Sequence, residues 1–174
     1  MKNKPDIYVI FEGPTEQKIL EFLKNNLETK YNILLINAKG KDNIIKKYLN
    51  KKRINRYNDV IVMYDLDDVD TLDSIYQMYD SKEITIDKKD IYFINPCVEI
   101  MFIFFKEYKV PSKNKLGLFI KKLYGVENYE KSDKQLNKIV KQINLTELPL
   151  LIKNLSSFKE TNYDKLINKL FKVK

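Results

Sequence analysis

The chain has 174 residues, 44% of them hydrophobic, which is long enough for one well-buried core and too short for a second full domain. Its formal charge of +8 suits a polyanionic partner, although the general richness in Lys, Ile and Asn, as in AT-rich genomes, accounts for basicity nearly as well. The absence of histidine and the single cysteine, Cys97, exclude an internal disulfide, zinc sites of the Cys/His kind and histidine-dependent triads. A metal site in this chain must therefore use oxygen ligands.

No apolar segment approaches the roughly 20 residues that a membrane span requires, and the first residues do not resemble a signal peptide. We therefore expect a cytoplasmic protein without membrane association.

Four short apolar runs predict strands, and the first of them has the pattern of a strand that is buried on both faces of a parallel sheet. They cover residues 7–11, 33–36, 60–64 and 91–94. Between them, apolar residues recur at helical spacing. The first of these helices is predicted to begin near Pro14, and the second after Asp42, which caps it, with Leu49 on its apolar face. A third helix is predicted over residues 72–79, after Thr71 as the cap.

The second half of the chain is predicted to be helical. Residues 97–105 form an almost wholly apolar segment, interrupted by Glu99, and are predicted to be a buried helix. After Pro111 strand signals stop, and helices are expected over 116–123, 132–143, 148–155 and 166–171, the second of them behind a capping box of Ser132 and Gln135.

This order of elements predicts an α/β fold with a four-stranded parallel sheet and helices on both faces. We expect residues 1–110 to form the α/β domain and residues 111–174 to form a helical extension packed on it. The first and third strands both end in acidic residues. We therefore infer that they are neighbours, which gives the strand order 2-1-3-4.

Glu12 directly follows the first strand, and Asp65 and Asp67 follow the third. The carboxyl ends of parallel strands are where α/β proteins build their sites. Asp65 and Asp67 are two residues apart, so in an extended chain both side chains project to one side. Converging carboxylates repel one another unless a cation lies between them. An all-oxygen site favours Mg²⁺ or Mn²⁺, or Ca²⁺ if the cage is larger, and the acidic loop lacks the glycine and glutamate of an EF-hand.

Several charged residues have simpler explanations. Asp70 and Asp73 are interpreted as helix-capping acids, and the basic residues at 51–53 and 56 as a solvated helix end. For Glu99, helix capping and a role as a buried acid paired with a metal ion or a lysine remain equally open. Cys97 is interpreted as a small core residue.

At these positions the sequence resembles the TOPRIM family, which has a glutamate after the first strand, here Glu12-Gly13, and an Asp-x-Asp after a later strand, here Asp65-Leu66-Asp67. Within that family, E12-G13-P14-T15-E16 and N95-P96-C97-V98-E99 are similar to segments of the RloB-like branch, as is Y129-E130-K131-S132-D133-K134. Together these segments span roughly residues 5–140.

The resemblance implies a TOPRIM-like (Rossmann-like) fold and an Mg²⁺-dependent nuclease of the RloB-like and OLD-type group, acting in bacterial defence against phage. By position, Glu12 matches the glutamate of acid/base chemistry, Asp65 and Asp67 the metal ligands, and Glu99 the acid added in this branch, while Glu16 is a further candidate ligand. A glycine often found after the Asp-x-Asp pair is missing, and Val98 stands where an aromatic residue is common.

The predicted reaction is hydrolysis of phosphodiester bonds in DNA or RNA by one or two metal ions. Four cations are candidates for contacting the phosphate: Lys39, Lys41, Arg53 and Lys113. The resemblance to RloB-like and OLD-like proteins suggests an ATPase partner. The chain cannot supply that activity itself, because it contains no phosphate-binding loop of the G-x-x-x-x-G-K-[ST] type. Two alternatives stay open: a non-catalytic TOPRIM-like binding subunit of a defence complex, and a ribosomal RNA maturase.

Overall fold

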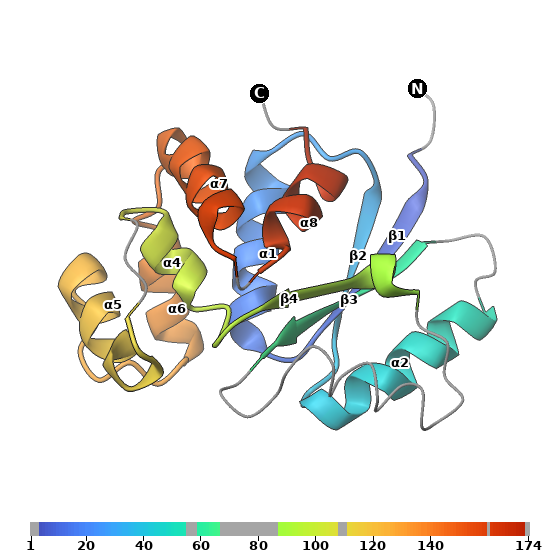
Figure 1. Ribbon diagram of the computed structural model, residues 1–174, viewed down its shortest axis with the longest axis horizontal. Helices are drawn as coiled ribbons and strands as arrows, with labels where there is room; N and C mark the ends of the chain where they lie inside the picture. The colour runs from blue at the N-terminus through green and yellow to red at the C-terminus, as the bar shows by residue number, and fades with distance from the viewer. Residues whose placement is uncertain (1–3, 55–58, 67–86, 108–110, 160, 173–174) are drawn as a thin grey trace.

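The computed structural model describes residues 4–54, 59–66, 87–107, 111–159 and 161–172 (Figure 1). Four parallel strands form one sheet: β1 (Asp6–Phe11), β2 (Asn32–Asn37), β3 (Asp59–Asp65) and β4 (Ile91–Ile94). Their order is β2-β1-β3-β4. The α/β class, the parallel sheet and the strand order predicted from the acidic strand ends are thus confirmed.

The helices of the described residues follow the predicted periodicity closely. They are α1 (Pro14–Asn26), α2 (Lys41–Ile54), α4 (Ile100–Phe104), α5 (Leu116–Tyr124), α6 (Asp133–Val140), α7 (Leu148–Ser157) and α8 (Tyr163–Leu170), with short 3₁₀ turns at Lys88–Asp90, Lys113–Lys115 and Leu145–Glu147. The predicted helix over 72–79 lies outside the described residues.

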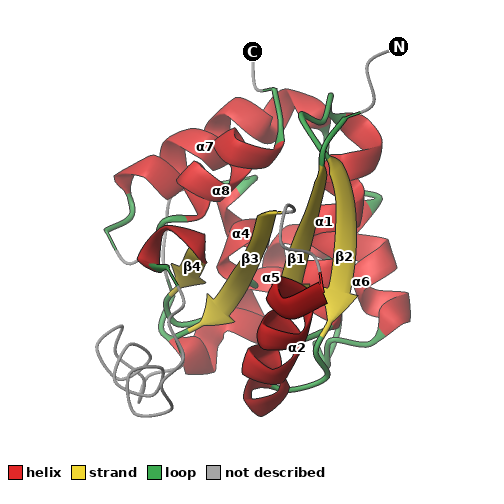
Figure 2. Cartoon of the chain, turned by 90° about the vertical axis from the view of Figure 1, so that its right-hand side faces the viewer, coloured by secondary structure: helices red, strands yellow, loops and turns green. Residues whose placement is uncertain are grey.

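Strand alternation divides the core between the two faces of the sheet. Ile7, Val9 and Phe11 of β1 pack into the larger cluster, which includes α1, α4 and the later helices. Ile10 points to the opposite face and packs with apolar residues of α2, such as Ile44. Figures 1 and 2 show the same division, with α2 on one face and the remaining helices on the other.

The C-terminal helices share this core with the sheet. Tyr124 of α5 donates its hydroxyl to the carbonyl of Phe102, and Asn154 of α7 donates to the carbonyl of Phe104. Asn162 covers the free edge of β4, because its side chain accepts from the N–H of Phe93 at 2.7 Å and donates to Ile91 O at 3.0 Å. Among the described helices, none is long and apolar enough to cross a membrane.

Three local predictions were wrong. The buried helix is shorter than 97–105: it begins at Ile100, because the preceding residues form a turn whose Val98 N–H donates to Asp65. Asp42 lies inside the first turn of α2 rather than ahead of it. Leu49 is 41% exposed instead of buried, because it lies at the rim of a surface pocket beside Tyr48.

The predicted capping box is only half formed. Ser132 accepts from the backbone N–H of Gln135, but the Gln135 side chain bonds to Glu127, Asn128 and Glu130 instead of returning to Ser132. The loop before α6 folds back over the start of the helix, and its backbone forms the hydrogen bonds of the Gln135 side chain.

Candidate functional site

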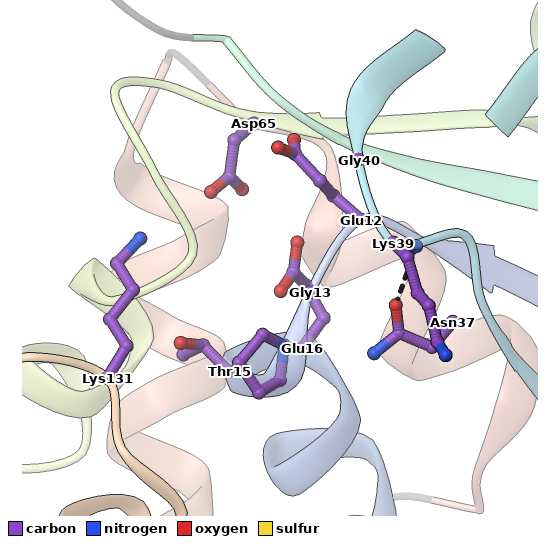
Figure 3. Close-up of a pocket in the computed structure, with 10 residues that line it drawn as sticks. Glu12, Gly13, Thr15, Glu16, Asn37, Lys39, Gly40, Asp65 and Lys131 are labelled. Carbon is purple, nitrogen blue, oxygen red and sulfur yellow. Dashed lines mark hydrogen bonds between the residues drawn. The ribbon is translucent and has the colours of Figure 1, made fainter. Parts of the chain in front are cut away.

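A pocket of about 420 Å³ opens at the carboxyl end of the sheet. Its walls come from the segments that follow β1, β2 and β3, from the first turn of α1, and from the loop before α6 (Figure 3). The lining residues are Glu12, Gly13, Pro14, Thr15, Glu16, Asn37, Lys39, Gly40, Asp65 and Lys131.

Neighbouring strands bring Glu12 and Asp65 to this pocket. β1 and β3 are parallel and paired in register from Ile7↔Asp59 to Ile10↔Val62, so their carboxyl ends meet at the same edge. Glu12 directly follows β1, and Asp65 is the last residue of β3. Asp65 is 7% exposed and accepts a hydrogen bond from Val98 N–H at 3.0 Å. Both carboxylates face the pocket in Figure 3.

The loop after β2 closes one wall. Ala38 N–H donates to Phe11 O at 2.8 Å and Gly40 N–H donates to Glu12 O at 3.2 Å, so this loop is tied to the end of β1. Gly40 has φ +119°, a conformation that only glycine adopts without strain. The loop brings Lys39 to the pocket lining.

Glu16 adds a third carboxylate from the first turn of α1. It is 3% exposed and points into the same space as Glu12 and Asp65 (Figure 3). Burial raises the pKa of Glu16 from 4.5 to about 7, and the charges of Glu99 and Glu12 add to this effect against hydrogen bonds from the backbone.

The pKa of Asp65 is also raised, first by burial and then by the charges of Glu16 and Glu99, against the hydrogen bond from Val98. If all these carboxylates were ionised, several negative charges would lie close together in a buried space. That arrangement is unfavourable in the absence of a cation. A bound cation relieves that conflict.

Glu99 lies behind the pocket and has no solvent-exposed surface. Its Oε1 accepts from the Thr15 hydroxyl at 2.9 Å and forms an ion pair with Lys131 Nζ at 2.8 Å. Its Oε2 is buried and has no hydrogen-bond partner among the described residues. Such a buried, unsatisfied carboxylate oxygen is uncommon in folded proteins and fits a site that completes its bonding with a ligand.

Cys97 is 5% exposed, and burial, followed by the charge of Glu99, raises the pKa of its thiol. A thiol that resists ionisation is a poor nucleophile, which agrees with the interpretation of Cys97 as a core residue.

The structure brings together three of the five predicted ligands in the pocket, namely Glu12, Glu16 and Asp65. Glu99 is linked to the pocket through Thr15 and Lys131, and Asp67 lies outside the described residues. Among the four candidate cations, Lys39 lines the pocket, whereas Lys41, Arg53 and Lys113 do not.

Sequence reasoning assigned no role to Thr15, Tyr129 or Lys131. All three interact with Glu99. Thr15 and Lys131 contact its carboxylate, and burial, followed by the charge of Glu99, raises the pKa of Tyr129. The Tyr129 hydroxyl is buried and has no hydrogen-bond partner among the described residues. Their one signal in the sequence is that they fall within the segments similar to the RloB-like branch.

Among the residues that the structure describes, no three His, Cys, Asp or Glu side chains are grouped in an arrangement that could hold a metal ion as it stands. The residues present nevertheless suit a hard cation, because they offer carboxylate oxygens only, with elevated pKa values for Glu16 and Asp65 and an unsatisfied Glu99 Oε2. Mg²⁺ and Mn²⁺ are the ions that such ligands select.

Comparison of the chain with protein-family models, with curated proteins and with solved structures finds no match.

Proposed function

We propose that this chain is a TOPRIM-like nuclease that uses Mg²⁺ or Mn²⁺ to hydrolyse phosphodiester bonds of nucleic acid. The main support is the convergence of Glu12 and Asp65 at the adjacent carboxyl ends of β1 and β3, with Glu16 buried in the same pocket. Carboxylates in this arrangement are what a hydrolytic metal site needs.

In this proposal Glu12, Glu16 and Asp65 would hold the ion, and Asp67 is the predicted fourth ligand. When bound, the ion would act as a Lewis acid and lower the pKa of water. Glu12 has a second role besides holding the ion. Glu12 accepts the proton of the attacking water, because it lies directly at the end of β1 and lines the open pocket. Lys39, from the loop after β2, contacts a phosphate oxygen of the substrate.

The resemblance to the RloB-like branch supports phage defence as the setting and an ATPase as the partner. The net charge of +8 is compatible with a nucleic-acid substrate.

The test is a cleavage assay on DNA and RNA with Mg²⁺ or Mn²⁺. Glu12→Gln and Asp65→Asn are expected to abolish cleavage, because each removes a carboxylate charge while keeping the shape of the side chain. Asp59→Asn is the matched control, since Asp59 begins the same strand β3 at its opposite end and is exposed. Equal activity in the parent and in both pocket variants rejects the proposal.

The second candidate is a non-catalytic binding subunit of a defence complex, in which the same pocket would not catalyse hydrolysis. Isothermal titration separates the two. Absence of Mg²⁺ and Mn²⁺ binding together with absence of cleavage supports the binding subunit, whereas cleavage of a single defined RNA precursor identifies a maturase.

A further inference from the structure

Glu99 is the most deeply buried acid of the site and already has a cation. Lys131 Nζ lies 2.8 Å from its Oε1, and the Thr15 hydroxyl donates to the same oxygen at 2.9 Å. Oε1 thus accepts from two donors, and Oε2 alone remains without a partner among the described residues. A metal ion that approached Glu99 would have to share its carboxylate with an ammonium group.

The backbone holds Lys131 in this position. Lys131 has φ +57°, in the left-handed region that residues other than glycine seldom adopt. Ser132 follows directly as the N-cap of α6, so the start of a helix fixes the chain at this point. Figure 3 shows the Lys131 side chain reaching toward the carboxylates of the pocket, with its ammonium group on the side of Asp65.

The ion pair joins a buried acid to a partly exposed lysine. The Lys131 side chain is 52% exposed, whereas the Glu99 side chain has no exposed surface. Glu99 therefore has a cationic partner of its own before any metal ion binds.

Two-metal sites place their ions about 3.5–4 Å apart and bridge them with shared carboxylates. An ammonium group 2.8 Å from Glu99 repels a second ion at that carboxylate. A first ion would bind in the pocket that Glu12, Glu16 and Asp65 line. We propose that Lys131 is a built-in cation that takes the place of a second metal ion on Glu99, so that the pocket binds one divalent ion and not two. This inference rests on the proposed function, because it concerns the metal site of the same pocket.

The test counts bound Mn²⁺ by isothermal titration of the full chain with MnCl₂ alone. The parent is expected to bind one ion, and Lys131→Met is expected to bind two, because the second ion gains the freed Glu99 carboxylate. Lys134→Met is the matched control: Lys134 is exposed, lies in the same region and does not line the pocket, so this variant binds one ion.

Two further variants separate charge from folding. Lys131→Arg keeps the positive charge and is expected to bind one ion. Lys131→Met combined with Glu99→Gln also binds one ion, because the second ion has lost its ligand. In the presence of a chelator, Lys131→Met alone is expected to lower Tm by about 5 °C, and Mn²⁺ to restore more of its Tm than it adds to the parent.

The outcomes distinguish the two proposals. If the parent binds two ions, or if folded Lys131→Met still binds one, Lys131 does not stand in for a metal ion and the proposed function remains intact. If the parent binds no ion, both proposals are wrong.

Discussion

The two ends of the sheet both carry clusters of acidic residues, but they balance charge differently. At the amino end, Asp59, Asp87 and Asp90 border a pocket of about 330 Å³. Each of these acids has its own lysine: Lys169 at 3.8 Å from Asp59, Lys89 at 2.6 Å from Asp87 and Lys52 at 3.2 Å from Asp90. Hydrogen bonds from Lys89 lower the pKa of Asp87. Each acid of this cluster therefore has a cation within 4 Å.

At the carboxyl end, three acids and two lysines line the pocket, and the buried Glu99 adds a fourth carboxylate. The pKa values of Glu16 and Asp65 are raised, first by burial and then by neighbouring carboxylates. An excess of buried carboxylates over nearby lysines, rather than the number of acids, therefore distinguishes the candidate metal site from the cluster in which each acid has a lysine.

The largest expected effect contrasts the two ends of β3. Asp65→Asn should reduce nucleic-acid cleavage at least about 100-fold, because it removes a metal ligand and keeps the Oδ1 that accepts from Val98. Asp59→Asn should leave the cleavage rate unchanged. Initial rates at saturating Mg²⁺ provide the measurement, and a comparable loss in both variants would show that the two ends do not differ in function.

The second prediction concerns the dependence of stability on pH. Because folding raises the pKa of Glu16 from 4.5 to about 7, the contribution of this group to stability is complete below pH 4.5 and is lost as the pH rises through 7. In a chelator at about pH 8, Glu16→Gln should therefore be more stable than the parent by about 2–3 kcal/mol, and the difference should vanish at low pH. Urea unfolding at both pH values measures it.

Glu21→Gln is the control for this experiment, since Glu21 lies on the same helix with an exposed side chain. If the parent and Glu16→Gln lose stability in parallel over this pH range, ionisation of the buried Glu16 does not destabilise the fold. The proposed excess of buried negative charge at the carboxyl end is then wrong.

Two glycines of the carboxyl-end pocket, Gly40 and Gly13, should differ in how much stability the protein loses when each is replaced by alanine. Gly40→Ala should cost about 1–2 kcal/mol, because φ +119° is strained for any residue with a Cβ. Gly13 has extended backbone, and an added Cβ would lie at an ordinary 3.6 Å from Glu16 Oε2, so Gly13→Ala should change stability by no more than about 0.5 kcal/mol. Denaturant titration of both variants compares them, and equal losses would contradict this account of the loop.

The smallest effect is expected at the amino end. Lys52→Met leaves Asp90 without its ion pair, and should cost about 1 kcal/mol, because the Lys52 side chain is 38% exposed and solvent screens the pair. Mn²⁺ should not restore the lost Tm, in contrast to its effect on Lys131→Met. Thermal unfolding with and without Mn²⁺ tests this, and recovery by Mn²⁺ would place a metal site at the amino end.

Much of the fold was predictable from local pattern. The apolar runs at β1, β2, β3 and β4 are short and unbroken, and the helical segments between them favour a parallel sheet. β1 and β3 are mostly buried, whereas β2 at the sheet edge is mostly half-buried. Apart from the exposure of Leu49, the errors arose at helix ends. The starts of α2 and α4 and the side chain of Gln135 depend on loops whose paths the periodicity does not encode.

The candidate site was predictable where acids directly follow strands. Glu12 and Asp65 could be expected to meet, because the ends of neighbouring parallel strands lie at one edge of the sheet. The charge pattern of the sequence did not reveal that the acids of the amino end are each paired with a lysine, since those lysines come from separate elements.

The sequence by itself determined the class of fold, the strand order and the restriction to oxygen ligands, because these follow from apolar periodicity, from acids at strand ends and from the absence of histidine. Only the tertiary structure decided the surroundings of Glu99. Thr15 from α1 and Lys131 from the loop before α6 meet on its carboxylate because the later helices pack against α1 and α4, and such long-range contacts depend on how the whole core is assembled.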